Sequence, residues 1–102
     1  MCMTIVLLVK YRGSEGAARM FADEVASTGI LDRVRAEDGN IEYEYYRSLS
    51  DPDEVLLVER WRDRAALDAH KAGEPLALIG EIKGRLGLEA SVTEIDVRTG
   101  CY

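Results

Sequence analysis

The stretch from Gly39 to His70, GNIEYEYYRSLSDPDEVLLVERWRDRAALDAH, decides how the rest of the chain folds. It indicates a strand, a turn, a second strand and a short helix, because apolar residues first alternate and then recur at helical spacing. Trp61, the only tryptophan, closes the second strand, and His70, the only histidine, lies on the helix. The segment therefore predicts an aromatic plate, an imidazole and polar groups around one cavity.

The residues before this stretch predict one central strand and one interrupted helix. The strand, about Met3 to Tyr11, is apolar on both faces, as expected of a strand covered on both sides. The helix spans Glu15 to about Arg35, with Gly29 as a weak point where it kinks or ends and restarts. Gly39 is its expected stop.

Two strands pair within the deciding stretch. In the first, about Asn40 to Arg47, Ile41, Tyr43 and Tyr45 alternate with polar residues, which predicts one buried face. The second, Glu54 to Arg62, follows a turn rich in Asp and Ser.

Two helices and one strand complete the chain. Helices are expected over Arg64 to Lys71 and about Pro75 to Leu86. Within the second helix, Gly80 and Gly84 either weaken it or permit close packing. The last strand, about Leu88 to Arg98, changes apolar phase between Val92 and Ile95, which predicts a β-bulge or a strand that leaves the sheet.

The predicted order is βαββααβ, an α+β fold of ferredoxin-like type. Helices on one face of the sheet leave the other face uncovered, and two of its strands are apolar on both sides. A homodimer with sheets packed face to face is the simplest way to cover them.

Composition limits the classes of protein that this chain can represent. Its 102 residues suit a single domain spanning 1–102. Its 13 basic and 19 acidic residues, net charge -6, argue against nucleic acid or an anionic membrane as partner. The first apolar run, Ile5 to Val9, is too short for a membrane span or signal segment, so we expect a cytoplasmic protein. Cys2 and Cys101 are expected to be free thiols, although pairing of the terminal strands would bring them close enough for a disulfide.

Three residues of the deciding stretch are candidates for chemistry. His70 is the best general base that the chain offers, because imidazole ionises near neutral pH. Glu59 alternates with apolar residues and should point inward, so it either pairs with an arginine or serves a pocket. Trp61 alone would be assigned to the core.

Two further residues have both an ordinary and a functional interpretation. Asn40 is common in turns, but its amide could bind an oxyanion in the cavity. Tyr43 is typical of strands, but it could line a pocket. No nucleotide-binding loop, metal-ligand cluster or flavin motif occurs in the sequence, so we expect an enzyme of this kind to work without a bound metal or a nucleotide cofactor.

The chain resembles the antibiotic biosynthesis monooxygenase family, including its quinol monooxygenase-like members. The likeness covers about Met3 to Val97 and is carried by Gly39-Asn40, Tyr43-Glu44, Asp51-Pro52, Glu59-Arg60-Trp61, Asp63, Ala66-Leu67 and His70. It implies a dimeric α+β barrel whose last strand often reaches across to the partner. It also implies a pocket between sheet and helices, where several members oxygenate quinols or anthrone-like phenols with O₂ and no bound metal or flavin.

The resemblance also implies roles for individual residues. Asn40, Trp61 and His70 match pocket positions and are the expected catalytic residues: His70 moves the proton, Trp61 stacks on and confines the substrate, and Asn40 binds the oxyanion. Glu59 matches a motif carboxylate, and we expect it, with Tyr43, to contact the aromatic substrate.

Two departures from the family pattern affect the expected substrate. The segment Lys71 to Leu78 lacks the aromatic residue or second histidine that family members often carry, and the first strand lacks the asparagine of haem-degrading relatives. Haem degradation is therefore disfavoured. The alternatives are an isomerase of small hydroxy-carbonyl compounds and a non-catalytic, dimeric ligand-binding or stress protein.

Overall fold

The computed structural model describes residues 2–99 and contains the predicted α+β elements. Their order is βααββααβ, because the first predicted helix is present as two. The elements are β1 (Cys2–Arg12), α1 (Ala17–Ser27), α2 (Ile30–Arg35), β2 (Asn40–Arg47), β3 (Glu54–Trp61), α3 (Arg64–Lys71), α4 (Glu74–Arg85) and β4 (Glu89–Thr99).

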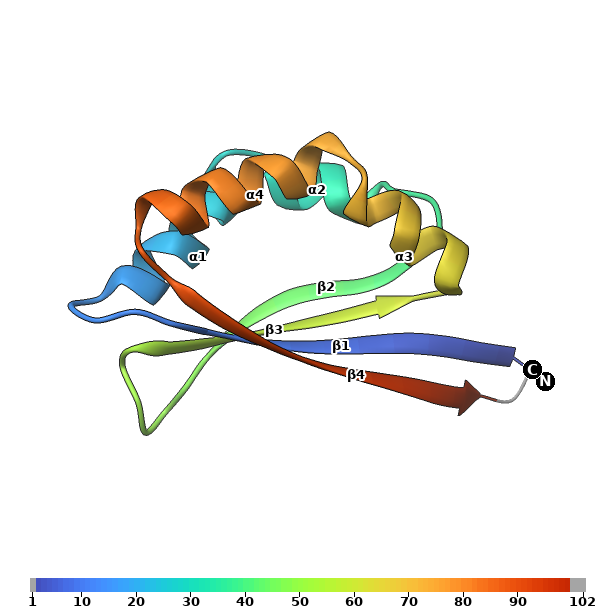
Figure 1. Cartoon of the computed structure of the whole chain (residues 1–102), viewed down its shortest axis with the longest axis horizontal. Coiled ribbons are helices and arrows are strands. Elements are labelled where there is room, and N and C mark those ends of the chain that lie inside the picture. The colour runs from blue at the N-terminus through green and yellow to red at the C-terminus, as the bar shows by residue number, and fades with distance from the viewer. Residues whose placement is uncertain (1, 100–102) are drawn as a thin grey trace.

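The four strands form one antiparallel sheet in the order β2-β3-β1-β4, and the helices cover one of its faces (Figure 1). The strand β1 is central, as predicted from its two apolar faces. Its register places Ile5 opposite Trp61 and Leu7 opposite Glu59, so these side chains all point toward the helices. The ferredoxin-like fold predicted from the sequence is confirmed.

Three glycines bear on the helices: one separates two of them, and two lie beside open space. Gly29 has φ 81° and separates α1 from α2, because a residue in the left-handed region cannot continue a right-handed helix. The restart predicted at Gly29 is thus confirmed. A Cβ atom added to Gly80 or Gly84 would meet no atom within 4 Å, so neither residue permits close packing of α4.

The prediction that Ile41 is buried was wrong. The β2–β3 register shifts between Asn40 and Glu42, which leaves Ile41 as the extra residue of a β-bulge with 53% of its surface exposed. Alternation resumes beyond the bulge, and Tyr43 is buried as predicted.

The prediction that β4 contains a β-bulge or leaves the sheet was also wrong. The register between β1 and β4 runs without a shift from Cys2 opposite Thr99 to Arg12 opposite Glu89. Val92 and Ile95 simply point to opposite faces of an edge strand and are 61% and 42% exposed. The apolar phase changes because Val92 lies on the helix-covered side of the sheet and Ile95 on its open side.

The core lies between the sheet and the helices. Its largest fully buried side chains include those of Phe21, Tyr43, Leu57, Trp61 and Leu67. None of the helices within residues 2–99 is both long and apolar enough to cross a membrane. Cys101, and with it the predicted choice between free thiols and a disulfide, falls outside the described residues.

Candidate active site

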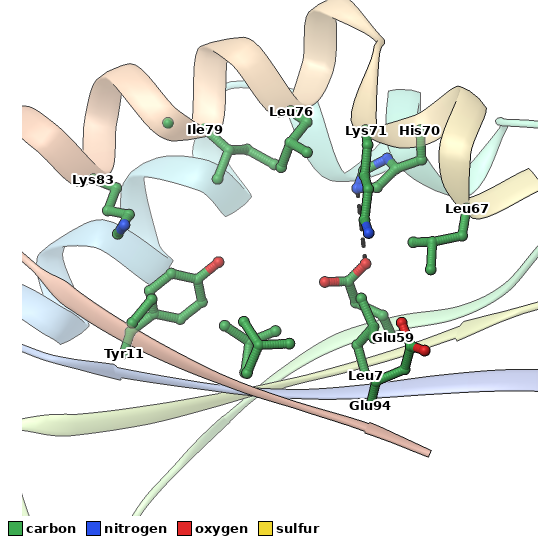
Figure 2. Close-up of a pocket in the computed structure, with 14 residues that line it drawn as sticks. Leu7, Tyr11, Glu59, Leu67, His70, Lys71, Leu76, Ile79, Lys83 and Glu94 are labelled. Carbon is green, nitrogen blue, oxygen red and sulfur yellow. Dashed lines mark ion pairs between the residues drawn. The ribbon is translucent and has the colours of Figure 1, made fainter. Parts of the chain in front are cut away.

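A cavity of about 500 Å³ lies between the β1–β4 side of the sheet and the helices α3 and α4 (Figure 2). This volume is in the range of small-molecule sites. Its walls are mainly apolar and come from Leu7, Val9, Tyr11, Leu67, Leu76, Ile79, Ala90 and Val92. Glu59, His70 and Lys71 lie at one end, and the Tyr11 hydroxyl and Lys83 at the other (Figure 2).

Glu59 is the buried carboxylate of the cavity. It is 5% exposed, and its Oε1 accepts a hydrogen bond of 3.0 Å from the Trp61 Nε1–H. Burial raises the pKa of Glu59, and the hydrogen bond from Trp61 and electrostatic attraction to His70 and Lys71 counteract part of this rise. Of the two interpretations open from the sequence, the pocket role agrees with this geometry, since Glu59 has no arginine partner among the described residues.

His70 connects the cavity to a carboxylate that the sequence did not single out. Its Nδ1 lies 2.9 Å and 3.0 Å from the two carboxylate oxygens of Glu37, and its Nε2 lies 3.7 Å from Oε1 of Glu59. An ionised carboxylate can only accept, so Nδ1 carries the proton when Glu37 is ionised. In the neutral imidazole Nε2 then carries the lone pair, and this atom has no hydrogen-bond partner among the described atoms.

Two aromatic rings hold the His70 ring in place. The Trp61 indole stacks on it, with centroids 4.5 Å apart and an interplanar angle of 30°. The Tyr43 ring meets it edge-on at 5.7 Å. The imidazole is 2% exposed, so it is confined between these rings, Glu37 and the cavity.

The turn between α2 and β2 brings Glu37 to α3. The Glu37 carbonyl accepts from the Asn40 amide at 3.1 Å, and the Gly39 carbonyl accepts from the Arg62 amide at 2.8 Å. Gly39 has φ 82°, and a Cβ atom there would come within 2.4 Å of the Ala66 Cβ. Only glycine lets the turn lie this close to α3. Glu37 itself precedes an ordinary turn, so no local pattern marked it as a partner of His70.

The predicted site residues occupy three kinds of position. Glu59 and His70 line the cavity. Trp61 and Tyr43 do not line it; they are buried behind it, and both contact His70. Asn40 is outside the cavity, and its side-chain amide donates to the Glu42 carbonyl at 3.2 Å within the bulge.

The cavity also presents positive charge that the sequence analysis did not identify. Lys71 and Lys83 line it, and within residues 2–99 neither has an ion-pair partner. Glu94, the remaining acidic residue in the lining, is held by a two-point ion pair with Arg64, with distances of 3.0 Å and 2.6 Å. Within the same residues, no three His, Cys, Asp or Glu side chains are grouped so that they could hold a metal ion.

Helices over one face of a four-stranded antiparallel sheet, with a cavity between the two layers, define a ferredoxin-like α+β protein with room for a small molecule. The family model described as "Antibiotic biosynthesis monooxygenase" matches residues 4–77, and the chain belongs to this family. Membership supports a monooxygenase-like role.

Relatives and solved structures agree with this placement. The chain is 41% identical over 61 residues to "Putative monooxygenase Rv0793" of Mycobacterium tuberculosis, and this match covers 55% of the chain and 58% of that protein. It is 29% identical over 41 residues to "Putative monooxygenase YcnE" of Bacillus subtilis, covering 40% and 43%. The chain thus aligns with about half the length of each relative. The crystal structure of "a putative antibiotic biosynthesis monooxygenase" from Deinococcus radiodurans has the same fold, with a TM-score of 0.82, 19% identity and 96% of both chains covered.

Proposed function

We propose that this chain is a monooxygenase that oxidises a quinol- or anthrone-like phenol with O₂ and needs no bound cofactor. One observation supports the proposal most strongly. The His70 imidazole faces an apolar cavity of about 500 Å³ with an Nε2 atom that has no hydrogen-bond partner among the described atoms, and its Nδ1 atom contacts the Glu37 carboxylate on the other side. Phenols of this class need mainly a base, a confined position and the exclusion of water, because their anions react with O₂ directly.

The first step of the proposed reaction is proton removal. The Nε2 lone pair of His70 takes the proton from a substrate O–H or acidic C–H bond, and Glu37 stabilises the imidazolium that forms. The Lys71 side chain extends toward the same end of the cavity, where its positive charge favours the substrate anion (Figure 2). General base catalysis of this kind contributes a factor of about 10²–10⁴.

The second step transfers electrons from the substrate anion to O₂. One electron gives superoxide and a substrate radical, and their combination forms a carbon–oxygen bond to a peroxide. His70 returns its proton to the outer peroxide oxygen. Loss of the remaining hydrogen from the same carbon, with cleavage of the O–O bond, leaves a carbonyl group and releases water. One oxygen atom enters the product, and the substrate supplies all the electrons.

The other predicted residues take positioning roles in this proposal. Trp61 holds Glu59 by a hydrogen bond and His70 by stacking, and Tyr43 packs against the edge of the imidazole. Asn40 donates to a main-chain carbonyl outside the cavity, so the oxyanion role expected of it passes in this proposal to Lys71.

Oxygen-uptake assays with a panel of quinols and anthrones test the proposal. His70→Gln should lower the turnover number by about 10²-fold or more, because it removes the base. Asp68→Asn, on the exposed side of the same helix, is the matched control and should retain normal turnover. Equal turnover by the His70→Gln variant for every accepted substrate would refute the assignment.

One observation favours an isomerase as the second candidate. The carboxylate of Glu59 and Nε2 of His70 both face the cavity, 3.7 Å apart, as suits the transfer of a proton between two carbons of a hydroxy-carbonyl compound. Turnover that proceeds equally without oxygen would identify this activity. Specific binding without turnover under either condition would identify a ligand-binding protein.

We also propose that the chain forms a homodimer through the open face of the sheet. This face carries Leu8, Leu56, Val58 and Ile95, which are half-buried or exposed, and Val6, which is already buried among its neighbours. Ile95 is 42% exposed, and no element within residues 2–99 covers it. Apolar surface of this kind is typical of an interface. Light scattering should give twice the chain mass for the unmodified protein and the chain mass for Ile95→Lys; a monomer at both would refute the proposal.

A further inference from the structure

His70 separates two pockets that lie on opposite sides of its ring. The first is the substrate cavity. The second is a cleft of about 360 Å³ between α3 and the turn before β2, and Glu37, Asp38 and Arg62 contribute to its lining. Among the described residues, His70 alone lines both.

The side chains on the two sides of the ring form a continuous polar row. From the cavity outward the order is Glu59, His70 and Glu37, with distances of 3.7 Å from Glu59 Oε1 to Nε2 and 2.9 Å from Nδ1 to Glu37 Oε1. Exposure is lowest at the imidazole and highest at the outer carboxylate: the His70 side chain is 2% exposed and that of Glu37 is 22% exposed. The far end of the row therefore reaches solvent in the cleft, whereas the imidazole does not.

We propose that His70 and Glu37 form a proton relay between the substrate cavity and the second cleft, in which Glu37 is the residue that positions the imidazole. This inference rests on the proposed use of His70 as a base. In the outward direction, the substrate–hydrogen bond breaks and an Nε2–H bond forms. The Nδ1 proton then moves to the Glu37 carboxylate, which releases a proton to water in the cleft. The reverse sequence returns a proton to the cavity.

A second route for protons has a physical purpose in this site. A bound aromatic substrate fills the apolar cavity and blocks water from the Nε2 side of the ring. His70 would then keep whatever protonation state it had when the substrate bound. With Glu37 in contact with the cleft, the imidazole can exchange protons with solvent while the cavity is occupied.

The neighbouring charges leave Glu37 free for this role. Asp38, its neighbour in the same cleft, is held by Arg62 through contacts of 3.2 Å and 3.0 Å, whereas the Glu37 carboxylate contacts His70. The other titratable groups near the ring are Glu59 and Tyr43, which face it from the sheet, and Lys71, the next residue in α3. Glu37 is the group among these that both touches the ring and lines the cleft.

The first test is independent of turnover. Because the chain contains one histidine, nitrogen-15 NMR of labelled protein gives a single imidazole pair of signals. At mildly alkaline pH we expect a protonated Nδ1 and an unprotonated Nε2 in the unmodified protein and in Asp38→Asn. Glu37→Ala, which removes the acceptor, should lose this preference. A protonated Nε2 in the unmodified protein, or unchanged signals in Glu37→Ala, would overturn the inference.

The second test uses a small acid in place of the missing carboxylate. Turnover of Glu37→Ala should fall on the order of 10²-fold, the lower end of what a base contributes. Added formate or acetate should restore it in a saturable way through the cleft, whereas chloride at the same concentration, an anion that does not carry a proton near neutral pH, should not. Asp38→Asn should turn over normally and show no response. A variant that stays folded, binds substrate and is not rescued would refute the relay.

The two tests separate this inference from the proposed function. If the unmodified protein oxidises no quinol or anthrone but has the expected imidazole signals, the proposed function fails and the pairing of Glu37 with His70 stands. If the protein oxidises quinols while Glu37→Ala is indistinguishable from it in both turnover and NMR signals, the inference fails and the proposed function stands.

Discussion

Replacement of Trp61 by phenylalanine should destabilise the protein by an amount that grows with pH. The change removes the indole N–H that donates to the buried Glu59 carboxylate and keeps an aromatic ring against His70. A hydrogen bond to a charged group contributes about 1.5–3 kcal/mol. The smaller ring should cost about 1 kcal/mol more through lost packing, at every pH.

The sign of the pH dependence follows from the pKa of Glu59. Burial raises this pKa in the folded state, so the folded chain holds the proton more tightly than the unfolded chain. The free energy of unfolding therefore falls as pH rises between the unfolded and folded pKa values. The Trp61 hydrogen bond lowers the pKa and limits this fall. Without it the pKa rises further, and the variant loses more stability on the alkaline side.

Urea denaturation followed by circular dichroism, from about pH 5 to about pH 8, measures the free energy of unfolding and so separates the hydrogen-bond contribution from the packing contribution. The cost of Trp61→Phe should be about 1 kcal/mol where Glu59 is protonated and about 2.5–4 kcal/mol where it is ionised. In a Glu59→Gln background the charge is absent, and the cost should not vary with pH. The cost of Trp61→Phe could instead be independent of pH in the unmodified protein, or depend on pH equally in the unmodified and Glu59→Gln proteins. Either result would refute the conclusion that Trp61 stabilises an ionised Glu59.

Three further predictions concern the turn, the buried charge and the cavity. Gly39→Ala should lower the free energy of unfolding by about 2–5 kcal/mol, because of the left-handed backbone and the contact with Ala66. Gly84→Ala should raise it by about 0.5–1 kcal/mol, because the space beside that residue is open. Urea denaturation compares the two variants, and a smaller cost for Gly39→Ala than for an ordinary surface substitution would contradict the geometry. Glu59→Gln should raise the midpoint of thermal unfolding at alkaline pH and not at acidic pH, since it removes a buried charge that is present only above the raised pKa. A rise at acidic pH alone would contradict the direction of the pKa shift. Leu76→Trp should fill part of the cavity and weaken quinol binding at least about tenfold in calorimetry, about 1.4 kcal/mol; unchanged affinity would place the ligand elsewhere.

The parts of the fold that follow from local patterns were predicted well. The alternation in β1 and β3 predicted a central strand and an inward-facing Glu59, and Gly29 predicted the break between α1 and α2. The errors at Ile41 and in β4 arose because an apolar side chain indicates burial without showing which face it occupies. A bulge and an edge strand each separate hydrophobicity from burial, and only strand pairing distinguishes them.

The sequence by itself determined the α+β class, the pairing of Trp61 and His70 in one segment, and an acidic chain with a single imidazole. The partners of that imidazole were decided by tertiary structure. Glu37 is 33 residues away from His70, and the two meet because a glycine turn packs against α3. The cavity was decided in the same way, because empty space depends on how sheet and helices are spaced, and no single residue encodes that spacing.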